Sequence, residues 1–250
     1  MEVFCAELAG VAVQIRCRCP ETRLFLREYE TGRAPDFSLE LSDADLQWAQ
    51  AELDRQDAAA GRDARPRSED AAENMVLHRL LAESLTEYGV LLVHGSALAL
   101  DGEGFLFTAP SGTGKSTHAA LWRQVFGERV QMLNDDKPLL RVRDDGVTVF
   151  GSPWDGKHHL SRNASAPLRA IARIERAAEN RAEPLPKAQA FPILMTQAYA
   201  SRDSAVMARI LRLEERILDL VPFYTLRCNR EPAAARTAYE RLRLSNLTSV

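Results

Sequence analysis

Residues 104–122 read GFLFTAPSGTGKSTHAALW, and this stretch decides the fold. The apolar run 104–108 predicts a strand, the segment 109–117 a glycine-rich loop, and the segment 118–122 part of a helix that follows the loop. A loop of this composition between a strand and a helix presents its backbone N–H groups to a phosphate at the helix N-terminus. The stretch therefore predicts a phosphate-binding P-loop and a nucleoside triphosphate as its ligand.

The spacing within the loop supports this interpretation. The usual pattern is G-x-x-x-x-G-K-[ST], and only its first glycine is replaced, by Ala109. Lys115 supplies a positive charge for the outer phosphates, and the hydroxyl of Ser116 can hold Mg²⁺. The alternative is a surface turn with an incidental lysine, which the flanking strand and helix make the weaker hypothesis. The residues expected to bind the nucleotide are Ser111, Gly112, Thr113, Gly114, Lys115, Ser116 and Thr117.

The composition is that of a globular protein. The chain has 250 residues, 46% of them hydrophobic, and a net charge of −3. This length suits one large domain, or one domain with a small appendage. A net charge this close to zero does not predict a basic surface for binding nucleic acid or an anionic membrane. We see neither a secretory signal at the N-terminus nor an apolar run as long as a membrane span, so we expect a cytoplasmic protein.

The cysteines favour the same compartment. Cys5, Cys17, Cys19 and Cys228 are few for this length and have no paired C-x-x-C spacing. Reduced thiols are therefore expected. A metal site at Cys17 and Cys19 is the alternative, but no second cluster accompanies them.

Hydrophobic patterning divides the chain into two parts. Residues 1–70 predict a small α+β unit, with strands within 3–15 and 37–41, a helix capped by Ser42 or Asp43, and a linker at 57–70. Residues 71–250 predict the core, beginning with a helix that Gly89 ends. Expected strands of the core are 90–93, 97–100, 104–108, 130–133, 139–142, 147–150, 168–174 and 223–226. Expected helices are 115–126, 187–200, 204–220 and 231–244.

A second chemical signal lies twenty residues after Lys115. There an apolar strand ends in Asn134-Asp135-Asp136. One carboxylate at such a place can hold Mg²⁺, and the other can accept the proton of an attacking hydroxyl or orient a water. The alternative is a simple turn between strands. The phosphate loop upstream favours the functional interpretation.

Two further segments carry polar groups suited to a phosphate site. His94 follows the predicted strand 90–93 and can donate to a phosphate or lie beside the carboxylates. The segment 151–159 is a turn rich in chemistry-bearing residues, in which Lys157 can meet the γ-phosphate and Asp155 the metal. The alternatives are a structural histidine at 94 and a solvated corner at 151–159.

Taken together, His94-Gly95, the loop 109–117 and Asp135-Asp136 resemble the kinase core of HPr kinase/phosphorylase. That bacterial enzyme phosphorylates a serine of a sugar-transport phosphocarrier protein, and its core fold is shared with phosphoenolpyruvate carboxykinase. The resemblance covers about residues 88–230. It implies an α/β fold with a P-loop kinase core of this type, to which a small α+β N-terminal appendage is joined.

The resemblance also implies roles for individual residues. Lys115 would contact the β- and γ-phosphates, Ser116 and Asp135 would hold Mg²⁺, and Asp136 would be the general base. The enzyme's later Arg-Gly-Leu-Gly signature has no counterpart here, and 151–157 takes that place. The chain is therefore more similar to the stand-alone HPr-kinase-like proteins of bacteria, some of which phosphorylate a serine of a peptide.

Three functions follow from these signals. The first is an ATP- and Mg²⁺-dependent kinase whose partner is a peptide or protein that carries a serine. ATP is favoured because no Asn-Lys-x-Asp segment for guanine is present. The second is a non-catalytic, nucleotide-gated regulatory module in which 1–70 contacts a partner. The third is carboxykinase-like chemistry on a small acid, for which we cannot place the additional arginines and metal ligands.

Overall fold

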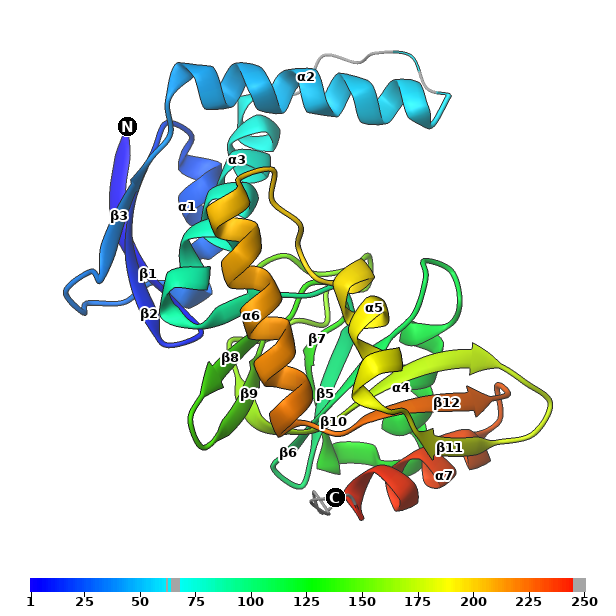
Figure 1. Ribbon diagram of the computed structural model, residues 1–250. Coiled ribbons are helices and arrows are strands. Elements are labelled where there is room, and N and C mark those ends of the chain that lie inside the picture. Colours follow the sequence, from blue (N-terminus) through cyan, green and yellow to red (C-terminus); the bar gives the residue numbers. More distant parts are fainter. Residues whose placement is uncertain (62, 64–67, 245–250) are drawn as a thin grey trace. The chain divides into compact units, whose positions relative to one another are not determined.

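The computed structural model describes residues 1–61, 63 and 68–244 (Figure 1). The backbone forms two compact units, Met1–Leu85 and Thr86–Val250. The division lies at 85/86, whereas the sequence predicts a boundary at 70/71. The helix at 69–84 belongs to the first unit because it packs on two other helices of that unit.

The first unit is a three-stranded sheet with helices. Strands β1 (Glu2–Leu8) and β2 (Val11–Cys17) form an antiparallel hairpin, and β3 (Phe37–Glu40) pairs parallel to β2. The predicted strands are thus confirmed. The helices are α1 (Pro20–Leu26), η1 (Arg27–Tyr29), α2 (Asp43–Ala59), α3 (Glu69–Ser84) and the first residue of η2 (Leu85–Tyr88).

Two expectations for this unit need correction. Ser42 caps α2 through a capping box with Asp45, as its position predicts, but the helix continues to Ala59. The expected linker 57–70 is therefore helical at both ends, in α2 and α3, and residues 62 and 64–67 lie outside the described part. Helix α1 was not predicted. Its start signals are Pro20, which is favourable at the first position of a helix, and Glu21 in the first turn, and it has no side-chain cap.

The second unit is built on a mixed sheet of nine strands. Seven of them follow the order β4-β8-β9-β10-β6-β5-β7, and the other two are β12, which pairs with β10, and β11, which pairs with β12. The strands are β4 (Val90–Leu92), β5 (Ser96–Leu100), β6 (Glu103–Thr108), β7 (Val130–Asn134), β8 (Leu139–Arg143), β9 (Gly146–Phe150), β10 (Ser165–Arg176), β11 (Arg181–Pro184) and β12 (Phe223–Cys228). The helices are α4 (Lys115–Phe126), η3 (Gly127–Arg129), α5 (Lys187–Gln197), α6 (Ser204–Leu220) and α7 (Pro232–Arg243). The chain is thus mixed α/β.

Strand direction gathers three segments at one edge of this sheet. Strands β6 and β7 both run antiparallel to β5, which lies between them. They are therefore parallel to one another, so Thr108 and Asn134 end at the same edge. The start of β5 lies at that edge too, and His94 lies two residues before Ser96, its first residue. In α/β sheets, ligands commonly bind beyond the carboxyl ends of strands.

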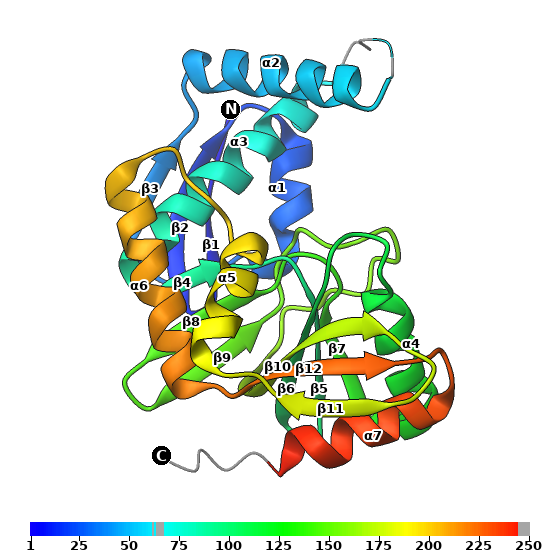
Figure 2. The same ribbon diagram turned by 45° about the vertical axis from the view of Figure 1, so that its right-hand side comes forward.

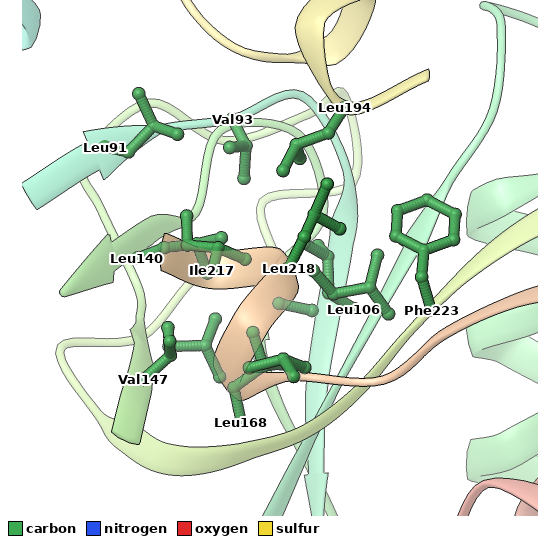
Figure 3. Packing of buried hydrophobic residues seen from close by; sticks show 14 of the residues in the cluster. Leu91, Val93, Leu106, Leu140, Val147, Leu168, Leu194, Ile217, Leu218 and Phe223 are labelled. Atoms are coloured by element: carbon green, nitrogen blue, oxygen red, sulfur yellow. The ribbon is translucent and has the colours of Figure 1, made fainter. Parts of the chain in front are cut away.

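Two hydrophobic clusters cover the two faces of the sheet. Alternating residues of β6 divide between them: Leu106 belongs to the cluster with α5 and α6, whereas Phe105 and Phe107 belong to the cluster with α4 and α7. Figure 3 shows Leu106 of the first cluster among residues that include Ile217 and Leu218. In Figure 2, α4 and α7 lie together beside the strands. The strand before the loop 109–114 is thus buried on both faces.

An aromatic group anchors α4 on its face of the sheet. The ring of Trp122, which is fully buried, lies with its centroid 5.1 Å from that of Phe105 and 5.4 Å from that of Phe107. Such tilted contacts stabilise beyond simple area burial. The helix that carries the loop is therefore held firmly. No helix in the described ranges is long and apolar enough to cross a membrane.

Candidate functional site

A cavity of about 860 Å³ lies at the sheet edge where β6 and β7 end. Its lining residues come from the loop 111–117, the strand ends, and the segment 155–158. They are His94, Ser111, Gly112, Gly114, Lys115, Ser116, Thr117, Ala120, Asp135, Asp136, Asp155, Gly156, Lys157 and His158. Every predicted site residue except Thr113 is among them, so segments distant in sequence meet in one place.

The loop between β6 and α4 has the backbone of an anion cradle. Gly112 and Gly114 have positive φ values, 75° and 132°, which side-chain-bearing residues rarely adopt. Gly114 is also the residue that precedes the first turn of α4. The free N–H groups and positive end of the helix dipole at such a position favour a phosphate. Thr113 lies on the outer side of the loop, where it lines a different hollow.

Lys115 is the cation inside the loop. Its side chain is buried, and Nζ donates to the carbonyl of Ala109, at a distance of 2.8 Å. Burial lowers the pKa of this ammonium from its usual value, and the repulsion of Lys137 acts in the same direction. Ala109 therefore serves the loop through its carbonyl group, and its side chain in place of the usual glycine does not prevent the loop from forming.

Arg176, from the end of β10, braces the loop from outside. Its Nη2 donates to the carbonyl of Gly112 at 2.6 Å, and its Nε donates to that of Thr113 at 3.0 Å. The N–H of Thr113 in turn donates to the carbonyl of Pro110 at 3.2 Å, so this part of the loop is held both by Arg176 and by its own backbone. Arg176 could not be identified from the sequence, because its partners are 63 and 64 residues away.

Asp135 has the properties of a cation ligand. The residue is 5% exposed, and Oδ1 accepts a hydrogen bond from the backbone N–H of Gly156 at 2.7 Å. Oδ2 is buried and has no hydrogen-bond partner among the described residues. A buried carboxylate oxygen without a partner is costly unless a cation or a proton satisfies it. Mg²⁺ fits, and Ser116 lines the same cavity to share it.

No cluster of three or more histidine, cysteine or acidic side chains that could hold a metal occurs in the part of the chain that the structure describes. Where Mg²⁺ accompanies phosphates it takes one or two carboxylates, and phosphates and waters complete its shell. Cys17 and Cys19, considered as a metal site from the sequence, have free thiols.

Asp136 lies between two basic side chains. His94 Nε2 is 3.3 Å from its Oδ1, and Lys137 Nζ is 3.2 Å from its Oδ2. The pKa of His94 lies below its ordinary value, mainly because the ring is partly buried and also because Lys115 and Lys137 repel a proton there. The neighbouring Asp136 carboxylate opposes this lowering. Its other basic partner, Lys137, was not singled out from the sequence.

The segment 155–158 forms the opposite wall. Asp155 accepts a hydrogen bond from Ser161 Oγ at 2.9 Å and lies 3.2 Å from Nδ1 of His159. Its carboxylate thus helps to shape its own loop while it lines the cavity. Lys157 is exposed at the cavity and has no recorded hydrogen bond or ion pair within the described ranges. It is therefore available to an anionic ligand.

Comparison with known proteins adds little. No family model matches the chain, and no curated protein matches it. The solved structure of the HPr(Ser) kinase/phosphatase from Coxiella burnetii is similar to it, with a TM-score of 0.36 and 14% sequence identity. That alignment covers 61% of this chain and 96% of the other. The likeness is loose.

Proposed function

We propose that the protein is an ATP- and Mg²⁺-dependent kinase that transfers the γ-phosphate to a hydroxyl, most favourably a serine of a peptide or protein. One observation carries the proposal. A single cavity brings together the loop 111–117, the buried carboxylate of Asp135 with its unpartnered oxygen, and the ion-paired carboxylate of Asp136. Phosphoryl transfer requires these parts: a phosphate cradle, a divalent-ion ligand and a group that accepts the hydroxyl proton.

Each residue has a distinct task in this scheme. The N–H groups of the loop and Lys115 bind the β- and γ-phosphates. Ser116 and Asp135 hold Mg²⁺, which supplies positive charge against the phosphate oxygens. Lys157, exposed at the cavity, neutralises further phosphate charge.

The transfer step involves Asp136. The acceptor oxygen forms a bond to the γ-phosphorus, the bond from that phosphorus to the β–γ bridging oxygen breaks, and the hydroxyl proton passes to the Asp136 carboxylate. ADP leaves with the bridging oxygen. In this scheme the proton acceptor is the Asp136 carboxylate, whose Oδ2 lies 3.2 Å from Nζ of Lys137.

The test is a transfer assay with γ-labelled ATP and a panel of serine-containing peptides. Asp136→Asn should lower transfer by about 100-fold or more, the usual contribution of a positioned base. ATP affinity should change by less than about threefold, because asparagine keeps the shape of the side chain and Asp136 is not among the residues assigned to bind the phosphates. Asp145→Asn, in the exposed turn between β8 and β9, is the matched control and should behave as the unaltered protein does.

Two results would contradict the kinase. The first is full transfer activity in Asp136→Asn. The second is tight ATP binding without labelling of any acceptor, which would favour the nucleotide-gated regulatory module instead.

A further inference from the structure

Asn134 uses both ends of its side-chain amide, each on a different segment. It is the last residue of β7 and is 0% exposed. Its Oδ1 accepts hydrogen bonds from the backbone N–H groups of Asp136 at 2.8 Å and Lys137 at 2.6 Å. Its Nδ2 lies 3.1 Å from the carbonyl oxygen of Ser152 and 3.2 Å from that of Trp154. One buried amide thus ties the turn after β7 to the segment 152–154.

A second side chain completes this link. The hydroxyl of Ser152, also fully buried, donates to the carbonyl of Lys137 at 2.6 Å and lies 3.2 Å from Nδ2 of Asn134. The two segments are therefore joined in both directions, by donors and acceptors from each side. In a buried network of this kind each satisfied group raises the cost of moving the others.

One of the linked segments carries Asp135, and the other leads to the backbone N–H that holds its carboxylate. The turn after β7 includes Asp135 itself. The segment 152–154 leads into Gly156, whose N–H holds Oδ1 of Asp135 at 2.7 Å. With Oδ1 held there, the other oxygen of the carboxylate is the one left unpartnered. The orientation of Asp135 therefore depends on the relative position of the two segments, which the Asn134 amide sets.

Other side chains do not reproduce this link. Aspartate accepts but cannot donate to the carbonyl groups of Ser152 and Trp154, and alanine does neither. Asparagine supplies both functions on one short, rigid side chain. The requirement at position 134 is thus for the amide rather than for polarity alone.

We propose that Asn134 is a positioning residue that orients Asp135 toward the divalent ion by fixing the 152–156 segment against the end of β7. The proposal rests on the proposed function, because it concerns the Mg²⁺ that accompanies the nucleotide. It predicts that Asn134 governs the metal-dependent part of nucleotide affinity and leaves the affinity of the phosphate loop itself unchanged.

The experiment measures the affinity of the full chain for a non-hydrolysable ATP analogue, once with Mg²⁺ and once with EDTA. In Asn134→Ala, affinity in EDTA should stay within about threefold of the unaltered protein, while the gain on adding Mg²⁺ should fall by about tenfold or more. Asn134→Asp keeps the acceptor but lacks the donors, so it should lose the gain as well. Ser152→Ala leaves the two backbone carbonyl acceptors of Asn134 in place and should lose only about two- to threefold.

The control separates positioning from general destabilisation. Ile217→Val shortens a fully buried side chain of α6 and should lower the melting temperature without changing the Mg²⁺-dependent gain. The inference is overturned if Asn134→Ala and Asn134→Asp keep the full gain, or if Ile217→Val loses the gain equally. If Asn134→Ala does not fold, Asn134→Asp decides the matter. A failure of the unaltered protein to bind the analogue would instead contradict the proposed function.

Discussion

The backbone N–H of Gly156 donates to Oδ1 of Asp135 across 2.7 Å, and this approach depends on the absence of a side chain at position 156. A Cβ atom there would lie 2.9 Å from Oδ2 of the same carboxylate and 3.0 Å from its Cγ. Such distances are shorter than non-bonded contacts allow, and the carboxylate is buried, so one of the two segments would have to move. The glycine thus keeps the carboxylate in its orientation.

Gly156→Ala should therefore weaken nucleotide binding through the metal. We expect the affinity for ATP in Mg²⁺ to fall by about tenfold, and the affinity in EDTA to be unchanged within about threefold. Titration calorimetry measures both. Gly32→Ala is the matched control, because a Cβ at Gly32 meets no atom within 4 Å. Equal affinity of Gly156→Ala and the unaltered protein in Mg²⁺ would show that Asp135 does not hold the ion.

Arg176→Ala should weaken nucleotide binding to the same extent with and without Mg²⁺. The guanidinium holds the carbonyl groups of Gly112 and Thr113 and thereby braces the loop. Because these hydrogen bonds are exposed, we expect a loss of about 1 kcal/mol, or about fivefold in affinity, in Mg²⁺ and in EDTA alike. Arg230→Ala, at another exposed arginine, should have no effect. A loss seen only with Mg²⁺ would contradict a role in bracing the loop.

The buried acid Glu214 should make the stability of the folded protein depend on pH. Its side chain is fully buried in α6, and neither carboxylate oxygen has a hydrogen-bond partner within the described residues. Burial raises its pKa from 4.5 to about 7. The folded state therefore binds this proton more tightly than the unfolded state does. The resulting stabilisation is fully present below pH 4.5 and is lost as the pH rises through about 7.

Glu214→Gln should remove this dependence. By the usual conversion, the shift corresponds to about 3 kcal/mol at high pH. At about pH 4 the variant and the unaltered protein should have the same free energy of unfolding. At about pH 8 that of the variant should be higher by up to about 3 kcal/mol. Urea unfolding at the two pH values measures this. Glu215→Gln, at an exposed neighbour, should show no such divergence. A constant difference at both pH values would mean that Glu214 is not buried as a neutral acid.

Local signals explain which elements the sequence predicted well. Helix α4 begins and ends at the predicted residues, 115 and 126, because its start is defined by the loop glycines and its end by Gly127. Strand β11 was missed, since only Ala182 of its four residues is buried and its pairing with β12 depends on tertiary structure. Helix α2 overran the expected linker because alanine-rich segments favour helix even without an apolar stripe.

The candidate site divides in the same way. Asp135, Asp136 and His94 could be proposed from sequence because each follows or precedes a recognisable strand. Asn134 and Arg176 could not be given a role, since their bonds reach residues 18 to 20 and 63 to 64 positions away. The position of a charged residue next to a predicted strand or loop is enough to propose it for the site. The orientation of its side chain depends on contacts between distant segments, which the sequence does not show.

The most direct test of a polyphosphate site is calorimetric titration of the full chain with a non-hydrolysable ATP analogue in Mg²⁺, with Lys115→Met beside the unaltered protein. The unaltered protein should bind one equivalent, and Lys115→Met should bind about tenfold or more weakly, because the buried ammonium at the loop is lost. Equal binding by the two proteins, or no binding by the unaltered protein at millimolar analogue, would contradict the account.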